Sequence, residues 1–146
     1  MSVLVDANTR LLVQGLGREG SYHASACRAY GTNMVAGVHP NRPGMKFEDA
    51  VPIFETAKDA IVETQANVGL IFVPAPSAAD AIIEQVDAGM PLVICISEGV
   101  PVQDMVKVRA YLEGSGSRLI GANCPGLITP GTKTKVGIMP GAIHQH

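Results

Sequence analysis

A glycine-rich stretch near the amino terminus carries the strongest chemical signal in the sequence. The residues GLGREG occupy positions 15–20, directly after a short apolar run and before a segment of helical pattern. Glycines at this spacing permit a tight turn, close approach of the backbone to a phosphate, and close packing of helix on strand, while free amides at the helix start bind the anion. The pattern predicts a phosphate-binding loop. The alternative is a tight strand-to-helix turn that binds nothing.

The residues after the second apolar run indicate which nucleotide such a loop would take. An NAD site has an acidic residue at the end of the second strand, where it binds the ribose hydroxyls. This sequence has HPNR at positions 39–42, so it offers the cation Arg42 in place of a carboxylate. A cation suits a phosphorylated ribose, either the 2′-phosphate of NADP or the 3′-phosphate of coenzyme A. The alternative for Arg42 is a solvated surface charge.

The cysteines and histidines form no pattern typical of a catalytic or metal site. Cys27, Cys95 and Cys124 share no close spacing, which argues against a disulfide framework or a zinc site and fits a reducing compartment. Cys124 has no basic or imidazole neighbour in the sequence, so we predict a structural role for it. The four histidines are His23, His39, His144 and His146. None is spaced with further ligands, and we predict no metal site.

The elements that must position these residues follow from hydrophobic patterning, since short apolar runs alternate with segments of helical period. The predicted strands are Arg10 to Gln14, Met34 to Val38, Val68 to Val73, Leu92 to Ile96 and Arg118 to Ile120. The predicted helices are Ser21 to Tyr30, Thr56 to Thr64, Ser77 to Ala88 and Val102 to Glu113, with N-caps at Thr56 and Ser77 and a stop at Gly89. Most strands are continuously apolar, as expected of strands covered on both faces. The pattern predicts an α/β fold with a Rossmann-like, three-layer, doubly wound and mainly parallel sheet.

The remaining segments are predicted as loops, and four of them follow strand carboxyl ends. They are HPNRPGMKFED at 39–49, VPAPS at 73–77, ISEGVP at 96–101 and GANCPGLITPGTKTK at 121–135. Ligands bind at that edge of an open α/β sheet, so we expect the site there. The last segment, VGIMPGAIHQH, begins another strand-like run and then stops, which we interpret as a domain boundary.

Composition limits the possible classes of protein. A chain of 146 residues with 47% apolar content fits one domain, spanning 1–146. A net charge of -2 and a pI near 6.0 disfavour nucleic acid and anionic membranes as partners. The longest apolar stretch, Val68 to Val73, is too short to span a membrane, and the first residues lack the pattern of a signal peptide. We expect a soluble, unexported domain.

Taken in order, the loops resemble the coenzyme A-binding domain of the succinyl-CoA synthetase (succinate-CoA ligase) alpha subunit family. The matching segments are LVQG, YGTNMVAGV, IFVPAPSAADAI, ISEGVPVQDM, RLIGANCPGLITPG and KVGIMPG, which cover nearly the whole chain in the family's order and spacing. The resemblance implies coenzyme A as the ligand and a beta subunit as the partner in the complete ligase. It also implies a location in the cytoplasm, or in the mitochondrial matrix of a eukaryote.

The resemblance further implies where coenzyme A is held. The implied contacts are Gly17, Arg18, Glu19, Gly20 and Arg42 at the nucleotide end, Val73, Pro74 and Pro76 beside the cofactor, Ile96, Ser97 and Glu98 along the pantetheine arm, and Asn123 near the thioester end. The glycine loop departs from the family's usual Gly-x-Thr-Gly-x-x-Gly, because it lacks the threonine and is one residue shorter. From the residues alone, the two prolines could instead stiffen a strand exit, and Ser97 with Glu98 could cap the next helix.

Full-length alpha subunits of the family continue into a second domain, whose histidine carries a phosphoryl group. This chain ends before that domain, so the resemblance implies that it contributes no catalytic residue and binds coenzyme A without catalysing thioester formation. Two other interpretations stay open. One is an NADP-binding domain of an oxidoreductase, which the glycine loop and Arg42 also fit; the other is a stand-alone coenzyme A-binding regulatory module.

Overall fold

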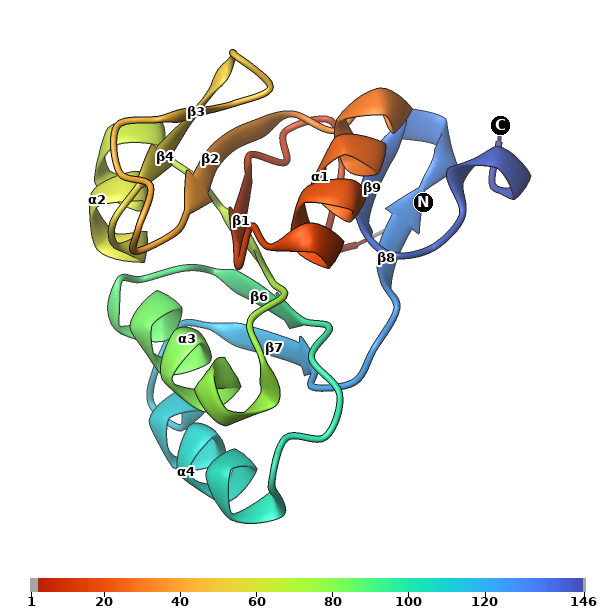
Figure 1. Ribbon diagram of the computed structural model, residues 1–146. Coiled ribbons are helices and arrows are strands. Elements are labelled where there is room, and N and C mark those ends of the chain that lie inside the picture. The colour runs from red at the N-terminus through yellow and green to blue at the C-terminus, as the bar shows by residue number, and fades with distance from the viewer. Residues whose placement is uncertain (1–2, 146) are drawn as a thin grey trace.

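A seven-stranded sheet forms the centre of the computed structural model, which describes residues 3–145 (Figure 1). Its strands are β1 (Leu11–Gln14), β2 (Met34–Val38), β3 (Lys46–Phe47), β4 (Val51–Phe54), β5 (Val68–Ile71), β6 (Leu92–Cys95) and β7 (Arg118–Gly121). The strand order is β3-β4-β2-β1-β5-β6-β7, and every pair is parallel except β3 with β4. The predicted Rossmann-like α/β fold with a mainly parallel sheet is confirmed.

Helices cover both faces of this sheet. They are α1 (Arg18–Tyr30), α2 (Ala57–Thr64), α3 (Ala75–Asp87) and α4 (Val102–Leu112). Figure 1 shows α2, α3 and α4 on one side, while α1 lies on the other beside a small hairpin of β8 (Gly126–Thr129) and β9 (Thr134–Gly137). The second face is therefore covered partly by a helix and partly by a β-hairpin.

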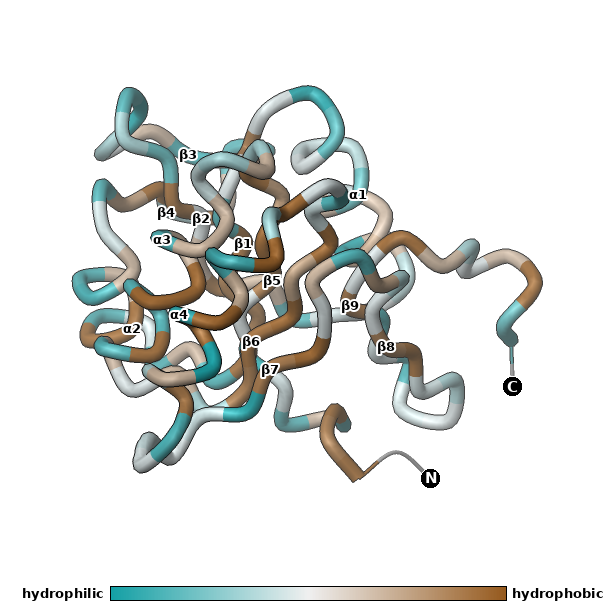
Figure 2. The backbone as a smooth tube through the Cα atoms, turned by 90° about the horizontal axis from the view of Figure 1, so that it is seen from below, coloured by the Kyte–Doolittle hydropathy of each residue, from teal (hydrophilic) through white to brown (hydrophobic). Residues whose placement is uncertain are grey.

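The core consists of two apolar layers separated by the sheet, because successive side chains of a strand point to opposite faces. Leu12 and Ile71 pack in the layer under α2, α3 and α4, whereas Leu11, Val13 and Leu70 pack in the layer under α1 and β9. All of these side chains are buried. This burial on both faces explains why the central strands are apolar throughout, and Figure 2 shows hydrophobic residues along the adjoining β6 and β7.

The order of the strands reverses direction at β1, and this reversal determines where a ligand can bind. From β1 the chain passes to β2 on one side and later returns to β5 on the other. Such a reversal of strand order opens a crevice at the strand carboxyl ends. The crevice lies at the ends of β1 and β5, next to the glycine loop.

Two helix starts differ from the prediction. Helix α1 begins at Arg18 rather than Ser21, so three residues assigned to the glycine loop form its first turn. Helix α3 begins at Ala75 after Pro74, without a side-chain cap, so the predicted N-cap at Ser77 is wrong. Proline suits the first turn because the amides there need no partner within the helix.

The other predicted helix signals are confirmed. The hydroxyl oxygen of Thr56 accepts the backbone N–H of Asp59 at 3.1 Å and caps α2. Gly89 follows the last residues of α3 with a φ of 83°, a backbone conformation that glycine adopts without strain.

Strands β3, β4 and β8 were not predicted, and β9 was predicted only in part, as the strand-like run that begins at Val136. Segments 39–49 and 121–135 were predicted as loops. The first contains β3, and the second contains β8 and the first half of β9. None of these strands has a continuous apolar run: β3 has two residues, β4 contains Pro52, and Gly126 pairs with Gly137 across the β8–β9 hairpin. Pairing with a neighbouring strand, which local sequence does not encode, forms them.

Within residues 3–145, no helix combines the length and apolar character needed to cross a membrane.

Candidate functional site

Two adjoining clefts open at the carboxyl edge of the sheet. The first cleft, of about 670 Å³, lies between the glycine loop, the exits of β1 and β2, and helix α3. The second cleft, of about 540 Å³, lies between the start of α1 and the exits of β5, β6 and β7. They share the side chains of Glu19, Phe72, Val73 and Pro74. A single elongated ligand can therefore pass from one into the other.

The three glycines of the loop have three different geometric roles. Gly15 has a φ of 95°, and a Cβ there would lie 2.7 Å from the backbone nitrogen of Val73. A Cβ on Gly20 would lie 1.9 Å from the carbonyl oxygen of Gly15, whereas one on Gly17 would meet nothing within 4 Å. Gly15 makes the turn, Gly20 lets the helix pack closely, and Gly17 leaves its backbone open to a ligand, as in a dinucleotide-type loop.

Helix α1 starts in a form suited to an anion. Its N-cap is Gly17, which has no side chain to cap the helix, and the N–H of Ser21 makes a bond to the Gly17 carbonyl at 2.9 Å. The amides of the preceding residues therefore have no acceptor inside the helix. These amides and the exposed Arg18 favour a phosphate at this point.

Arg42 lies against the glycine loop, as the sequence suggested for a ribose-phosphate contact. Its Nη1 donates a long hydrogen bond of 3.4 Å to the carbonyl oxygen of Leu16. The residue is exposed, so its charge can reach a ligand bound beside the loop. Arg18 and Arg42 bring two positive charges to this end of the site, beside the carboxylate of Glu19.

The opposite wall of the first cleft is acidic and fixed in place. Glu84 of α3 accepts hydrogen bonds from the side-chain amide of Gln14 at 2.8 Å and from the backbone N–H of Ala57 at 2.7 Å. The fully buried Gln85 donates to the oxygen of Gln14 at 2.9 Å. Because Gln14 ends β1, this network couples the floor of the cleft to helices α2 and α3.

Hydrogen bonds tie together the strand exits that line the second cleft. The hydroxyl of Ser97 donates to the carbonyl oxygen of Val73 at 2.5 Å, and the carbonyl oxygen of Ser97 accepts the N–H of Asn123 at 3.0 Å. Ser97 and Glu98 do not cap α4, because that helix begins at Val102 after Pro101. The exits of β5, β6 and β7 thus form one wall.

The cysteines are free thiols, and burial raises the pKa of each. Cys124 lines the second cleft, and its Sγ lies 3.3 Å from the carbonyl oxygen of Cys95. A thiol with a raised pKa is a poor nucleophile at neutral pH. The geometry supports the predicted structural role of Cys124.

Most of the residues implied by the resemblance meet at these clefts. Those lining the first or second cleft are Gly17, Arg18, Glu19, Gly20, Val73, Pro74, Ile96, Ser97, Glu98 and Asn123. Arg42 joins them through the glycine loop. Pro76 lines neither cleft: it is exposed in the first turn of α3, where it fits the helix start.

Several lining residues were missed by sequence reasoning. They include Gln14, His23, Phe72, Asp80 and Glu84. His23 lies four residues after Glu19, and Glu84 four residues after Asp80, so each pair shares a helix face. The spacing was visible in the sequence, but it does not indicate that these helix faces line a cleft.

No group of three or more His, Cys, Asp or Glu side chains is arranged to hold a metal ion within residues 3–145. His146, considered above as a ligand, lies outside the described residues.

Comparison with known proteins gives consistent matches. The family model described as "CoA binding domain" matches residues 6–99. The chain is 55% identical over 146 residues to a succinate-CoA ligase [ADP-forming] subunit alpha of Aquifex aeolicus, covering 98% of this chain and 47% of that protein. It is 50% identical to a mitochondrial succinate-CoA ligase [ADP-forming] subunit alpha-2 of Trichomonas vaginalis, covering 94% and 44%. The chain thus spans about half the length of these relatives.

A solved structure shares the fold. An ATP citrate lyase from Methanothrix soehngenii, in complex with citrate and coenzyme A, superposes with a TM-score of 0.75 at 24% sequence identity. The match covers 92% of this chain and 24% of that one. At this level of identity the likeness supports the Rossmann-like architecture alone.

Proposed function

Because the chain belongs to the CoA-binding domain family and is homologous to the amino-terminal region of succinate-CoA ligase alpha subunits, we propose that its two clefts hold coenzyme A for thioester formation with succinate in an ADP- or GDP-forming ligase. The observation that carries the proposal is the open backbone at Gly17, which lies beside free helix amides and two arginines and lines the first of two adjoining clefts.

The charge distribution suggests how coenzyme A would lie. Its phosphates carry the negative charge and suit the loop end, where Arg18 and Arg42 are found. The acidic wall at Asp80 and Glu84 would repel phosphates but tolerate the neutral adenine. The uncharged pantetheine arm would then leave through the second cleft, past Ser97.

The affinity for coenzyme A should depend on its 3′-phosphate and on Arg42. A hydrogen bond to a charged group contributes about 1.5–3 kcal/mol, and we take the lower value because Arg42 is exposed. Arg42→Ala should therefore weaken coenzyme A binding by about tenfold and leave dephospho-coenzyme A unaffected. Isothermal titration of both ligands against both proteins measures this.

The matched control is Arg109→Ala, an exposed arginine on α4 that is ion-paired with Glu113. This variant should bind like the wild type. Tighter binding of NADP than of coenzyme A would contradict the proposal and favour an oxidoreductase domain. Equal weakening of both coenzyme A forms by Arg42→Ala would show that Arg42 does not contact the 3′-phosphate.

We also propose that a second domain and a beta subunit, rather than this chain, supply the phosphoryl transfer. The purified chain with coenzyme A, succinate, ATP and Mg²⁺ should form no succinyl-CoA above a protein-free blank, because it spans only about half the length of the ligase subunits that it matches. Mass spectrometry of the thioester measures this. Turnover by the chain alone would overturn the assignment. The proposed location is the cytoplasm or the mitochondrial matrix, where free cysteines persist.

A further inference from the structure

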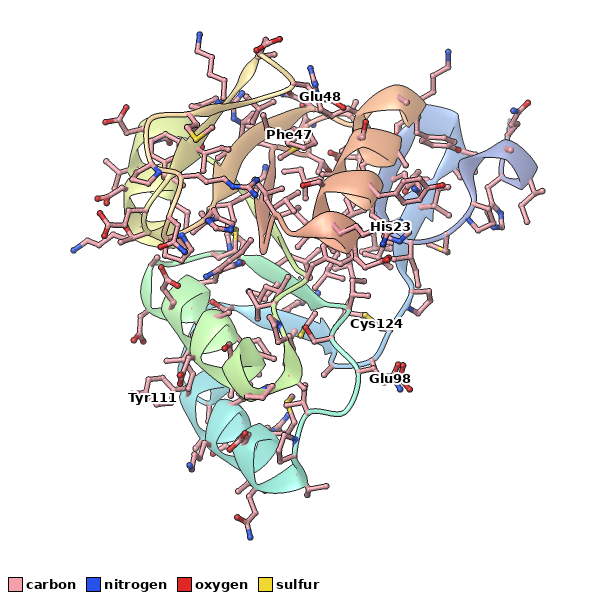
Figure 3. The ribbon with its side chains drawn as sticks, viewed as in Figure 1. His23, Phe47, Glu48, Glu98, Tyr111 and Cys124 are labelled. Atoms are coloured by element: carbon pink, nitrogen blue, oxygen red, sulfur yellow. The ribbon has the colours of Figure 1, made fainter. Side chains whose placement is uncertain are left out.

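His23 is held rigidly in the second cleft. Its imidazole stacks on the ring of Phe72 with centroids 5.5 Å apart and an angle of 4° between the planes, and it meets Tyr22 edge-on at 5.1 Å. Figure 3 shows His23 on α1, on the same side of the molecule as Cys124 and Glu98, and all three line this cleft. Stacking of this kind fixes the plane of the ring without using its nitrogens.

The charges around His23 favour a neutral imidazole. Burial is the main cause of its lowered pKa, and the charge of Lys135 on β9 adds to it, while Glu19 acts in the opposite direction. Lys135 is only 3% exposed and has no carboxylate partner within residues 3–145, so its charge is little screened. Glu19 lies 3.7 Å from Nε2 but is 79% exposed, which weakens its effect.

The other groups near the ring are two thiols, which hold their protons, and the carboxylate of Glu98. Cys124 and Glu98 lie across the cleft, on the segments after β7 and β6, and Cys27 is one turn further along α1. Both thiols have a raised pKa because of burial. His23 is therefore the imidazole that this cleft offers as a proton acceptor, and its lowered pKa favours the neutral form that accepts a proton.

The thiol of coenzyme A would be carried to this group. This step rests on the proposed function: with the phosphates at the glycine loop, the neutral arm extends into the second cleft past Val73 and Ser97. Beyond these residues the lining is formed by Asn123, Cys124 and His23. The reactive end of the arm thus comes near the imidazole, in a cleft that the carboxylates of Glu19 and Glu98 also line.

We propose that His23 is the base that accepts the proton of the bound coenzyme A thiol. As the sulfur forms a bond to the carbonyl carbon of an acyl phosphate, the S–H proton passes to the imidazole, the carbon–oxygen bond to phosphate breaks, and inorganic phosphate leaves. The imidazolium then returns the proton to water. The carboxylate of Glu19 faces the imidazolium ring of His23 and favours its positive charge. The positive charge of Lys135 favours the return of His23 to the neutral imidazole.

The test measures the rate at which iodoacetamide alkylates the thiol of bound coenzyme A, with the protein in excess. Mass spectrometry detects the alkylated coenzyme A itself, so alkylation of protein cysteines does not contribute to the signal. A positioned base typically contributes a factor of 10²–10⁴, so His23→Gln should slow alkylation of the bound thiol about a hundredfold. The matched control is His144→Gln, which lies near the carboxyl terminus and in neither cleft. It should react like the wild type.

The pH dependence of the alkylation rate distinguishes a general base from a residue that only lines the cleft. In the wild type the alkylation rate should rise with pH through the lowered pKa of His23 and then level off until the thiol itself begins to ionise. In His23→Gln the rate should show no such plateau and should rise about tenfold per pH unit until the thiol has ionised. Equal rates and profiles for the two proteins would overturn the proposal, as would weaker binding with an unchanged rate for the bound thiol. If titration shows no coenzyme A binding by the wild type, the proposed function fails, and the role of His23 fails with it.

Discussion

Gly20→Ala is expected to abolish coenzyme A binding and to destabilise the protein by about 3 kcal/mol. Gly20 is buried in the first turn of α1, and an added Cβ would lie 1.9 Å from the carbonyl oxygen of Gly15 and 3.2 Å from the Cβ of Phe72. Neither the backbone oxygen nor the strand exit can move without opening the loop. Alanine has a helix propensity about 1 kcal/mol better than glycine. A fall in the free energy of unfolding would therefore show that the steric clash outweighs this gain in helix propensity.

Urea unfolding and isothermal titration together measure these effects. Gly116→Ala is the control for both, because a Cβ there meets nothing within 4 Å and the residue lies away from the clefts. Gly17→Ala is the informative comparison: it should keep the stability of the wild type but weaken binding, because its backbone faces the proposed phosphate. If Gly20→Ala is as stable as the wild type, the close packing of the loop on α1 is not a constraint.

Gly69→Ala should have a comparable effect on stability, from the opposite layer of the core. Gly69 on β5 has ordinary strand geometry, but its Cβ would lie 1.7 Å from Oε1 of Gln85, which is fully buried. Gln85 cannot rotate away freely, since its amide donates to Gln14. We expect a loss of about 3 kcal/mol, and weaker coenzyme A binding because Gln14 lines the first cleft.

A double-mutant cycle identifies the cause. Gln85→Ala removes the atoms that the new Cβ would strike, so adding it to Gly69→Ala should cost less than the sum of the two single changes, with a coupling of about 1 kcal/mol or more. Unfolding of the four proteins in urea measures the coupling. Strictly additive losses would show that another neighbour, not Gln85, requires glycine at position 69.

The candidate site was predictable where local sequence determines backbone shape. The three loop glycines were found from their spacing, and the structure gives each a separate geometric reason. His23 and Glu84 were missed because no local sequence pattern identifies them. His23 stacks on Phe72, and Glu84 accepts a hydrogen bond from Gln14, which is 70 residues away in sequence. Pro76 was implied beside the cofactor, but α3 starts early enough to turn it away from both clefts.

The amino-acid sequence alone was enough to predict the class of fold, the five parallel strands β1, β2, β5, β6 and β7, and the glycine loop, because strands of such a sheet need apolar runs and a close-packed turn needs glycine. Strands β3 and β4, the pairing of β8 with β9 and the surroundings of His23 became evident only in the tertiary structure. The thiol of Cys27, for example, lies 3.6 Å from the carbonyl oxygen of Gly137, across 110 residues of sequence. Such contacts arise from the packing of distant segments, and that packing also sets the burial and the charge of Lys135 that lower the pKa of His23.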